Sequence, residues 1–141
     1  DRRPGMIVAD SNLLAYLLLG GPEAEDAERA FRRDPVWAAP VLWRSEFRSI
    51  LAGYMRRRKL RVADAAAVHE LAERLLAGRE YTVRGDAVLQ LAAESSCSAY
   101  DCEYVALAQE LQVPLVTWDR QVLRTFPAVA VAGPDFAGGN A

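Results

Sequence analysis

The sequence is poor in cysteine, histidine and lysine, and each shortage excludes a class of site. Two cysteines in 141 residues are too few for a disulfide framework or a set of four metal-ligating thiols, which indicates a reducing compartment. One histidine, His69, and no Gly-x-Ser-x-Gly motif argue against a serine hydrolase. No apolar run approaches the ~20 residues that cross a bilayer, and no secretory leader is recognisable. We therefore expect a cytoplasmic protein with no membrane association.

The composition indicates one globular domain. With 52% hydrophobic and 26% charged residues, the chain can bury a core. The formal net charge of −2 lacks the basic balance of a protein that coats nucleic acid, so any contact with RNA or DNA must be local. We expect the folded domain over residues 6–132, a ragged start over 1–5 and a flexible, glycine-rich tail over 133–141.

Short apolar runs alternate with helical patterns along the chain. Strands are expected at residues 6–9, 36–39, 81–83, 113–117 and 129–131. Helices are expected at residues 12–19, 23–33, 42–59, 62–77, 86–95 and 101–111. The first strand shows no polar alternation, which is typical of a strand buried on both faces of a parallel sheet. The alternation of strands and helices predicts an α/β fold.

Two of the expected strands end at a carboxylate. Asp10 follows the first strand, and Asp119 follows the strand at 113–117. Ligands of open α/β sheets bind at the carboxyl ends of strands, so we expect both acids at one crevice. Glu46 borders the apolar stripe of the helix at 42–59, and Asp101 opens the helix at 101–111, near loops at the edge of the domain. The positions of these four acids are compatible with one shared pocket.

Each acid also has an ordinary structural explanation. Asp10, Asp101 and Asp119 each precede a helical pattern, where an aspartate commonly serves as the N-cap. Glu46 can pair with an arginine of its own helix. It is the combination of strand-end positions with a carboxylate beside an apolar stripe that favours a pocket.

Four carboxylates in one pocket require compensating positive charge. Two unit charges ~5 Å apart repel by ~3 kcal/mol at an effective dielectric constant of ~20. Mg²⁺ and Mn²⁺ suit hard oxygen ligands of this kind. Such an ion also neutralises a scissile phosphate and activates water as a nucleophile. The acids therefore favour metal-dependent cleavage of a phosphodiester.

Four stretches carry these acids in order along the chain: Met6 to Asn12, Glu46 in its helix, Tyr100 to Ala108, and Leu115 to Arg120. Together they resemble the PIN-domain ribonucleases, and especially the VapC-type toxins. The resemblance implies a three-layer α/β/α sandwich with a mainly parallel central sheet. It implies Mg²⁺- or Mn²⁺-dependent endoribonuclease activity on RNA, homodimers, and inhibition by a cognate antitoxin protein whose tail enters the active-site groove.

The resemblance also implies roles for two sets of residues. The catalytic and metal-ligating acids are Asp10, Glu46, Asp101 and Asp119. The polar residues that support them are Ser11, Asn12 and Thr117. No nucleotide cofactor is expected, because the glycine pair at residues 20–21 belongs to neither a P-loop nor a dinucleotide fingerprint.

Three further features lie close to these motifs. Arg44 and Arg48 flank Glu46 and are expected to steer a substrate phosphate or an antitoxin carboxylate toward the metal. The basic run at residues 56–61 either contacts phosphates or lies in solvent at a helix end. Trp118, where the family often has a smaller residue, either narrows the groove and stacks on a base or packs into the core.

Two other functions stay open at this point. A catalytically silent PIN-like module would bind RNA or a protein without cutting. A receiver-type phosphoacceptor domain also places acids at strand ends, but its chemistry needs a lysine near the pocket. The only lysine, Lys59, lies at the far end of a helix, so this function is disfavoured.

Overall fold

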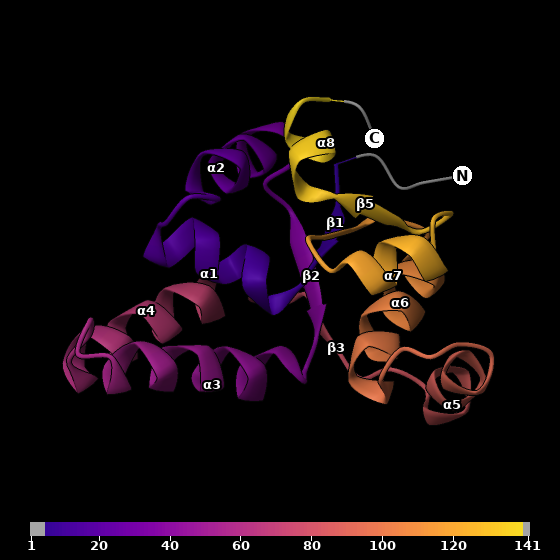
Figure 1. Cartoon of the computed structure of the whole chain (residues 1–141), viewed down its shortest axis with the longest axis horizontal. Coiled ribbons are helices and arrows are strands. Elements are labelled where there is room, and N and C mark those ends of the chain that lie inside the picture. The colour runs from indigo at the N-terminus through magenta and orange to yellow at the C-terminus, as the bar shows by residue number, and fades with distance from the viewer. Residues whose placement is uncertain (1–4, 140–141) are drawn as a thin grey trace.

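A computed structural model describes residues 5–139 and shows a sheet between two layers of helices (Figure 1). The strands are β1 (Ile7–Ala9), β2 (Trp37–Pro40), β3 (Glu80–Tyr81), β4 (Leu115–Thr117) and β5 (Ala130–Ala132). The helices are α1 (Ser11–Leu19), α2 (Ala24–Arg33), α3 (Trp43–Arg56), α4 (Val62–Leu75), α5 (Gly85–Ala93), α6 (Ala99–Leu111), α7 (Arg120–Thr125) and α8 (Gly133–Ala137). All strand pairs are parallel, in the order β3-β2-β1-β4-β5, so the predicted α/β/α sandwich is confirmed.

Each face of the sheet has its own hydrophobic core, because successive strand residues point to opposite faces. Ile7 and Ala9 of β1 pack with side chains of α1, α2, α3, α4 and α8. Val8, between them, packs with side chains of α5, α6 and α7. The two cysteines are buried and unbridged in this second core. Within the described residues no helix has the length and apolar character needed to cross a bilayer.

The predicted elements agree with the structure apart from their boundaries. The third strand covers Glu80 and Tyr81 rather than residues 81–83. The fourth begins at Leu115, because Pro114 has no N–H to give to the ladder. Pro114 instead accepts a hydrogen bond at its carbonyl from the backbone N–H of Val8, at 2.9 Å.

Residues 133–137 form helix α8, so the prediction of a flexible tail is wrong for them. Phe136 is 4% exposed and anchors α8 in the first core. The guanidinium carbon of Arg33 in α2 lies 4.3 Å from the centre of the Phe136 ring, and Arg33 Nη1 donates to the Phe136 carbonyl at 2.7 Å. A single buried aromatic thus outweighs the glycine-rich composition. Residues 1–4 and 140–141, the remaining ends of the predicted segments, lie outside the described residues.

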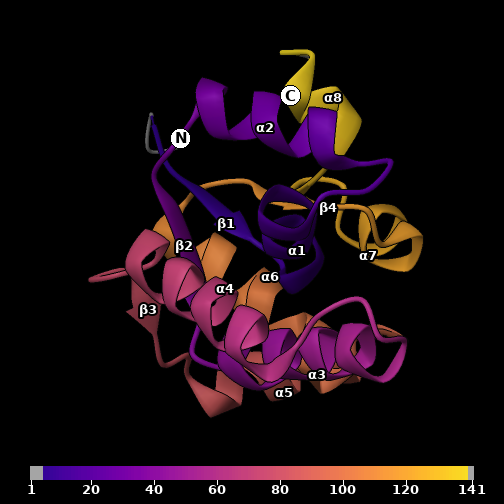
Figure 2. The same ribbon diagram turned by 90° about the vertical axis from the view of Figure 1, so that its left-hand side faces the viewer.

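The strand order creates a topological switch point between β1 and β4. From β1 the sheet extends through β2 to β3 on one side, and from β4 to β5 on the other. In open α/β sheets the crevice at the carboxyl ends of the two strands at such a point is the usual place for a ligand. Helices α1 and α3 pack against each other beside this point, with α4 running alongside α3 (Figure 2).

Candidate active site

A pocket of about 540 Å³ opens at the carboxyl ends of β1 and β4. All four predicted acids line it, namely Asp10, Glu46, Asp101 and Asp119. The three predicted supporting residues, Ser11, Asn12 and Thr117, line it as well. Side chains that are up to 109 positions apart in sequence therefore share one cavity.

Asp10 and Asp119 each combine two tasks. Asp10 caps α1, because its Oδ1 accepts a hydrogen bond from the backbone N–H of Leu13 at 2.8 Å. Asp119 caps α7 in the same way, with its Oδ1 accepting from Val122 N–H at 2.9 Å. The N-cap explanation is therefore correct for both residues. Each cap uses one carboxylate oxygen and leaves the second for other contacts.

Thr117 connects these two acids. Its hydroxyl donates to Asp10 Oδ2 at 2.6 Å and accepts from the backbone N–H of Asp119 at 3.0 Å. The Thr117 side chain is buried at the end of β4, so its rotamer is fixed by packing. These two hydrogen bonds fix the ends of β1 and β4 relative to each other at the base of the pocket.

Glu46 is held by two hydroxyl groups rather than by an arginine. Its Oε1 accepts from Ser11 Oγ at 2.9 Å and from the Tyr104 hydroxyl at 2.7 Å, and the two hydroxyl oxygens lie 2.8 Å apart. The expectation that Glu46 pairs with an arginine of its helix is wrong for this reason. Sequence reasoning did not single out Tyr104 and missed its polar role. Its position three residues after Asp101 on one helix, which brings the two onto neighbouring positions of the helix surface, was the available signal.

Asp101 lies in the first turn of α6 and does not cap it. The cap is Ser98, whose Oγ accepts from the backbone N–H of Asp101 at 3.1 Å. The N-cap explanation is therefore wrong for Asp101. Its side chain lines the pocket together with Glu46 and Asp119, which belong to other parts of the fold.

The electrostatics of the pocket disfavour negative charge. Burial raises the pKa of the Asp10 carboxyl to about 6, and the neighbouring charges of Glu46 and Asp119 add to the rise. Burial also raises the pKa of Asp101, followed by the charge of Asp119. None of the four acids forms an ion pair with a cationic side chain among residues 5–139. The pocket is therefore suited to a positively charged ligand.

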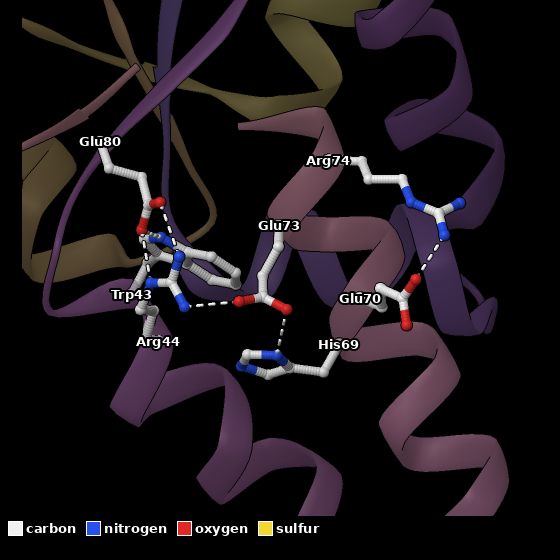
Figure 3. A network of polar contacts seen from close by, with 7 residues as sticks. All are labelled: Trp43, Arg44, His69, Glu70, Glu73, Arg74 and Glu80. Carbon is white, nitrogen blue, oxygen red and sulfur yellow. Dashed lines mark hydrogen bonds and ion pairs between the residues drawn. The ribbon is translucent and has the colours of Figure 1, made fainter. Parts of the chain in front are cut away.

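The two arginines expected to serve this pocket lie elsewhere. Arg44 is part of a separate network (Figure 3), in which its Nε and Nη2 donate to Glu80 at 2.7 and 2.8 Å and its Nη1 donates to Glu73 at 2.5 Å. Arg48 borders an apolar groove between α3 and α4 that also includes His69. Neither Arg44 nor Arg48 lines the acidic pocket, and the carboxylates of Glu73 and Glu80 already bind the Arg44 guanidinium.

The pocket's positive side chain is Arg57, which sequence reasoning did not single out from its basic run. It lines the pocket together with Gly53 at the far end of α3. The available signal was its spacing, since residues 46, 50, 53 and 57 recur every three or four positions along one helix face.

Trp118 and His69 pack in the structural core. The Trp118 ring meets the edge of Tyr16 with centroids 5.0 Å apart, and it does not line the acidic pocket. A Cβ added to Gly133 would lie 2.2 Å from the Trp118 ring, so only glycine fits there. His69 stacks on Trp43, with ring centroids 5.4 Å apart.

The donor set of the pocket fits a hard divalent cation. All four acids offer carboxylate oxygens, and hydroxyl groups orient two of them. Among the residues that the structure describes, no three acidic, histidine or cysteine side chains stand close enough to enclose an ion by themselves. This arrangement suits an ion such as Mg²⁺, which usually keeps several water ligands and binds through one or two carboxylates.

Comparisons with known proteins place the chain in a family context. A model of the PIN domain matches residues 7–129. Ribonuclease VapC3 of Pyrobaculum aerophilum is 31% identical over 126 residues, which cover 87% of this chain and 96% of that protein. The crystal structure of PAE2754 from the same organism superimposes with a TM-score of 0.73 at 19% identity, covering 96% of this chain and 88% of that one. A toxin–antitoxin complex from Klebsiella pneumoniae has a TM-score of 0.64 at 16% identity and covers 90% of this chain and 97% of that one.

Proposed function

The chain belongs to the PIN domain family, and on that premise we propose that it is a metal-dependent endoribonuclease and the toxin of a toxin–antitoxin pair. The observation that carries the proposal is the convergence of Asp10, Glu46, Asp101 and Asp119 on one pocket at the switch point of a parallel sheet. The relative from Pyrobaculum aerophilum is a ribonuclease, which supports RNA as the substrate. The similar fold in the Klebsiella pneumoniae toxin–antitoxin complex supports an antitoxin as the partner.

The four acids are proposed to hold Mg²⁺ or Mn²⁺. When bound, such an ion would supply positive charge at the scissile phosphate. It would also lower the pKa of water, so that a hydroxide nucleophile is available at neutral pH. Asp10 must be deprotonated to bind a cation, and its pKa of about 6 permits this at neutral pH. Because the pKa values of both Asp10 and Asp101 are raised, a cation would compete with protons for these carboxylates.

The polar residues of the pocket orient the acids. Thr117 donates to one oxygen of Asp10 and Leu13 N–H to the other, which fixes the plane of that carboxylate. Ser11 and Tyr104 both contact Oε1 of Glu46, which directs Oε2 away from them. Changes in such contacts typically lower the affinity of a metal site by ~10–100-fold. Asn12 is exposed at the rim of the pocket, where its amide is available to substrate.

The remaining parts of the proposal concern the whole protein. We place the nuclease domain over residues 6–132 together with α8, in the cytoplasm, acting as a homodimer. Dimerisation is tested by the molar mass of the purified chain in solution, for which twice 15.5 kDa is expected.

A cleavage assay tests the activity. The purified chain should cut single-stranded RNA in Mg²⁺ or Mn²⁺, and a chelator should abolish the cutting. The Asp10→Asn variant should be inactive but folded, because asparagine is an equally good N-cap for α1. Equal cleavage by this variant and the parent would remove the site from the proposal. RNA binding without cleavage by the parent would favour the catalytically silent module.

A further inference from the structure

One face of α3 forms a continuous wall of the acidic pocket. Glu46, Ile50, Gly53 and Arg57 recur on this face and all line the cavity. The wall begins at a carboxylate and ends at a guanidinium, so the pocket has an anionic end and a cationic end. The activity proposed above uses only the anionic end.

The Arg57 side chain folds back along the helix toward the pocket. Its guanidinium carbon lies 5.0 Å from the centre of the Tyr54 ring, one turn earlier. A Cβ built on Gly53 would lie 3.4 Å from Arg57 Nη1, so the guanidinium lies beside the space that a larger side chain at position 53 would fill. Glycine is a poor helix former, and here its lack of a side chain gives Arg57 a place to lie.

The donors of Arg57 are not used by an acid. Among residues 5–139, its side chain forms no ion pair and no hydrogen bond, whereas Arg44, Arg74 and Arg84 each have a carboxylate partner. Gly53 and Glu46 are seven residues apart, which corresponds to ~10 Å along the helix axis. This separation is well beyond an ion pair, so the guanidinium remains available to a ligand that enters the pocket.

We infer that Arg57 binds an RNA backbone phosphate that neighbours the phosphate to be cleaved. The inference rests on the proposed function, which puts the scissile phosphate at the acids. The planar fork of arginine matches phosphate oxygens in a bidentate manner. Because Arg57 lies at the opposite end of the α3 wall, it holds a different phosphate and directs the RNA strand along α3. The positive charge of Arg57 also offsets the repulsion between the carboxylates of the pocket and the RNA backbone.

Salt-dependent RNA binding tests this role. The probe is a fluorescein-labelled single-stranded RNA of mixed sequence, titrated by anisotropy in Mg²⁺ against an Asp10→Asn parent that does not cleave it. Adding Arg57→Gln should weaken binding about 10-fold. It should also reduce the slope of log K against log salt by ~0.7, the value for one phosphate contact on a single strand.

Arg56→Gln is the matched control. Arg56 is the neighbouring, exposed arginine on α3; it does not line the pocket, and its removal changes the net charge equally. It should leave the slope unchanged. Equal slopes for the Arg57 and Arg56 variants, or no salt-dependent RNA binding by the parent, would overturn the inference.

Cleavage kinetics separate this inference from the proposed function. In the otherwise unchanged chain, Arg57→Gln should raise KM about 10-fold and leave kcat unchanged, as expected for lost substrate binding that is equal in ground and transition states. Absence of cleavage by the unaltered chain would count against the proposed function alone. Cleavage with an unaltered KM in the Arg57 variant would count against the role of Arg57 alone.

Discussion

Two clusters of acidic side chains lie beside the first turn of α3, and they differ in whether their carboxylates are paired with an arginine. Glu46 belongs to the pocket, where four carboxylates have no ion-paired cation among the described residues. Arg44, two positions earlier, joins Glu73 and Glu80 in a network that links α3, α4 and β3 (Figure 3). In that network Trp43 Nε1 also donates to Glu80, at 2.6 Å.

The pKa shifts of the two clusters have opposite signs. Hydrogen bonds from Arg44 hold the pKa values of Glu73 and Glu80 below their usual range. Burial raises the pKa values of Asp10 and Asp101 instead. An acid whose pKa is lowered by folding stabilises the fold when charged, whereas one whose pKa is raised costs stability when charged. The paired cluster therefore serves the fold, and the unpaired one is the cluster expected to bind and react.

The largest expected effect is the loss of activity in Glu46→Gln. Glutamine keeps an acceptor for Ser11 and Tyr104 but loses the negative charge. Because changes in the residues that merely support a metal ligand cost ~10–100-fold, loss of this proposed ligand should lower the cleavage rate by at least ~100-fold. Initial rates on RNA in Mg²⁺ measure this, and urea unfolding should show no loss of stability. A nearly normal rate would place Glu46 outside the reaction.

A smaller loss of activity is expected for Tyr104→Phe. The change removes the hydroxyl that contacts Glu46 Oε1 and Ser11, so the carboxylate is less well oriented and metal binding should weaken ~10-fold. The readouts are the Mn²⁺ affinity measured by calorimetry and the Mg²⁺ concentration that gives half-maximal cleavage. Tyr100→Phe, at an exposed position of the same helix, is the control. Equal metal affinities for the two variants would contradict the orienting role.

Arg44→Gln should lower stability while leaving the chemistry intact. The change leaves Glu73 and Glu80 without their partner and should lower the free energy of unfolding by about 1–2 kcal/mol, a moderate value because a third of the Arg44 side chain is exposed. Urea unfolding measures it, with Arg48→Gln as a control on the same helix. Cleavage per folded molecule should not change. A strong loss of activity in folded protein would show that the network acts on the pocket.

The smallest expected effect is a difference in how the free energy of unfolding of the metal-free protein depends on pH. The pKa of Asp10 is raised from 3.8 to about 6, so its stabilising contribution is complete below pH 3.8 and is lost as pH rises through about 6. Glu73 and Glu80, with lowered pKa values, contribute above their ordinary pKa of 4.5, and this contribution is lost as pH falls below it. Asp10→Asn should remove the loss of stability that Asp10 causes as pH rises toward neutrality. Glu80→Gln should reduce the loss of stability as pH falls into the acid range. The free energy of unfolding, measured with urea at several pH values, tests this. If both variants change stability on the same side of the pH range, the expectation is contradicted.

The sequence was sufficient to predict the fold and to predict that the four acids share one pocket. Apolar strands buried on both faces have a distinct pattern, and the chain order of strands and helices leaves few topologies open. Asp10 and Asp119 could be placed because each directly follows such a strand. Their cap bonds, which looked like a competing explanation, proved compatible with the pocket.

The contacts between distant side chains could not be predicted in the same way. Arg44 lies within two positions of Glu46, but its partners Glu73 and Glu80 come from segments whose packing depends on the whole fold. Tyr104 fits an apolar helix stripe and also a polar role, because one end of its side chain is a ring and the other a hydroxyl. Phe136 anchors α8 in a region whose glycines suggested mobility. In each case the decisive partner is remote in sequence.

The pairing of β1 with β4 also affects when the site can form during synthesis. The contact between Asp10 and Thr117 spans 107 positions, and Asp119 follows two residues later. A ribosome-bound chain that ends before Leu115 lacks Asp119, one of the four proposed acids, and also β4, whose Thr117 orients Asp10. Under the proposed function, an unfinished or prematurely terminated product would be harmless to RNA. Nuclease potential would then be acquired only after β4 and Asp119 have been synthesised.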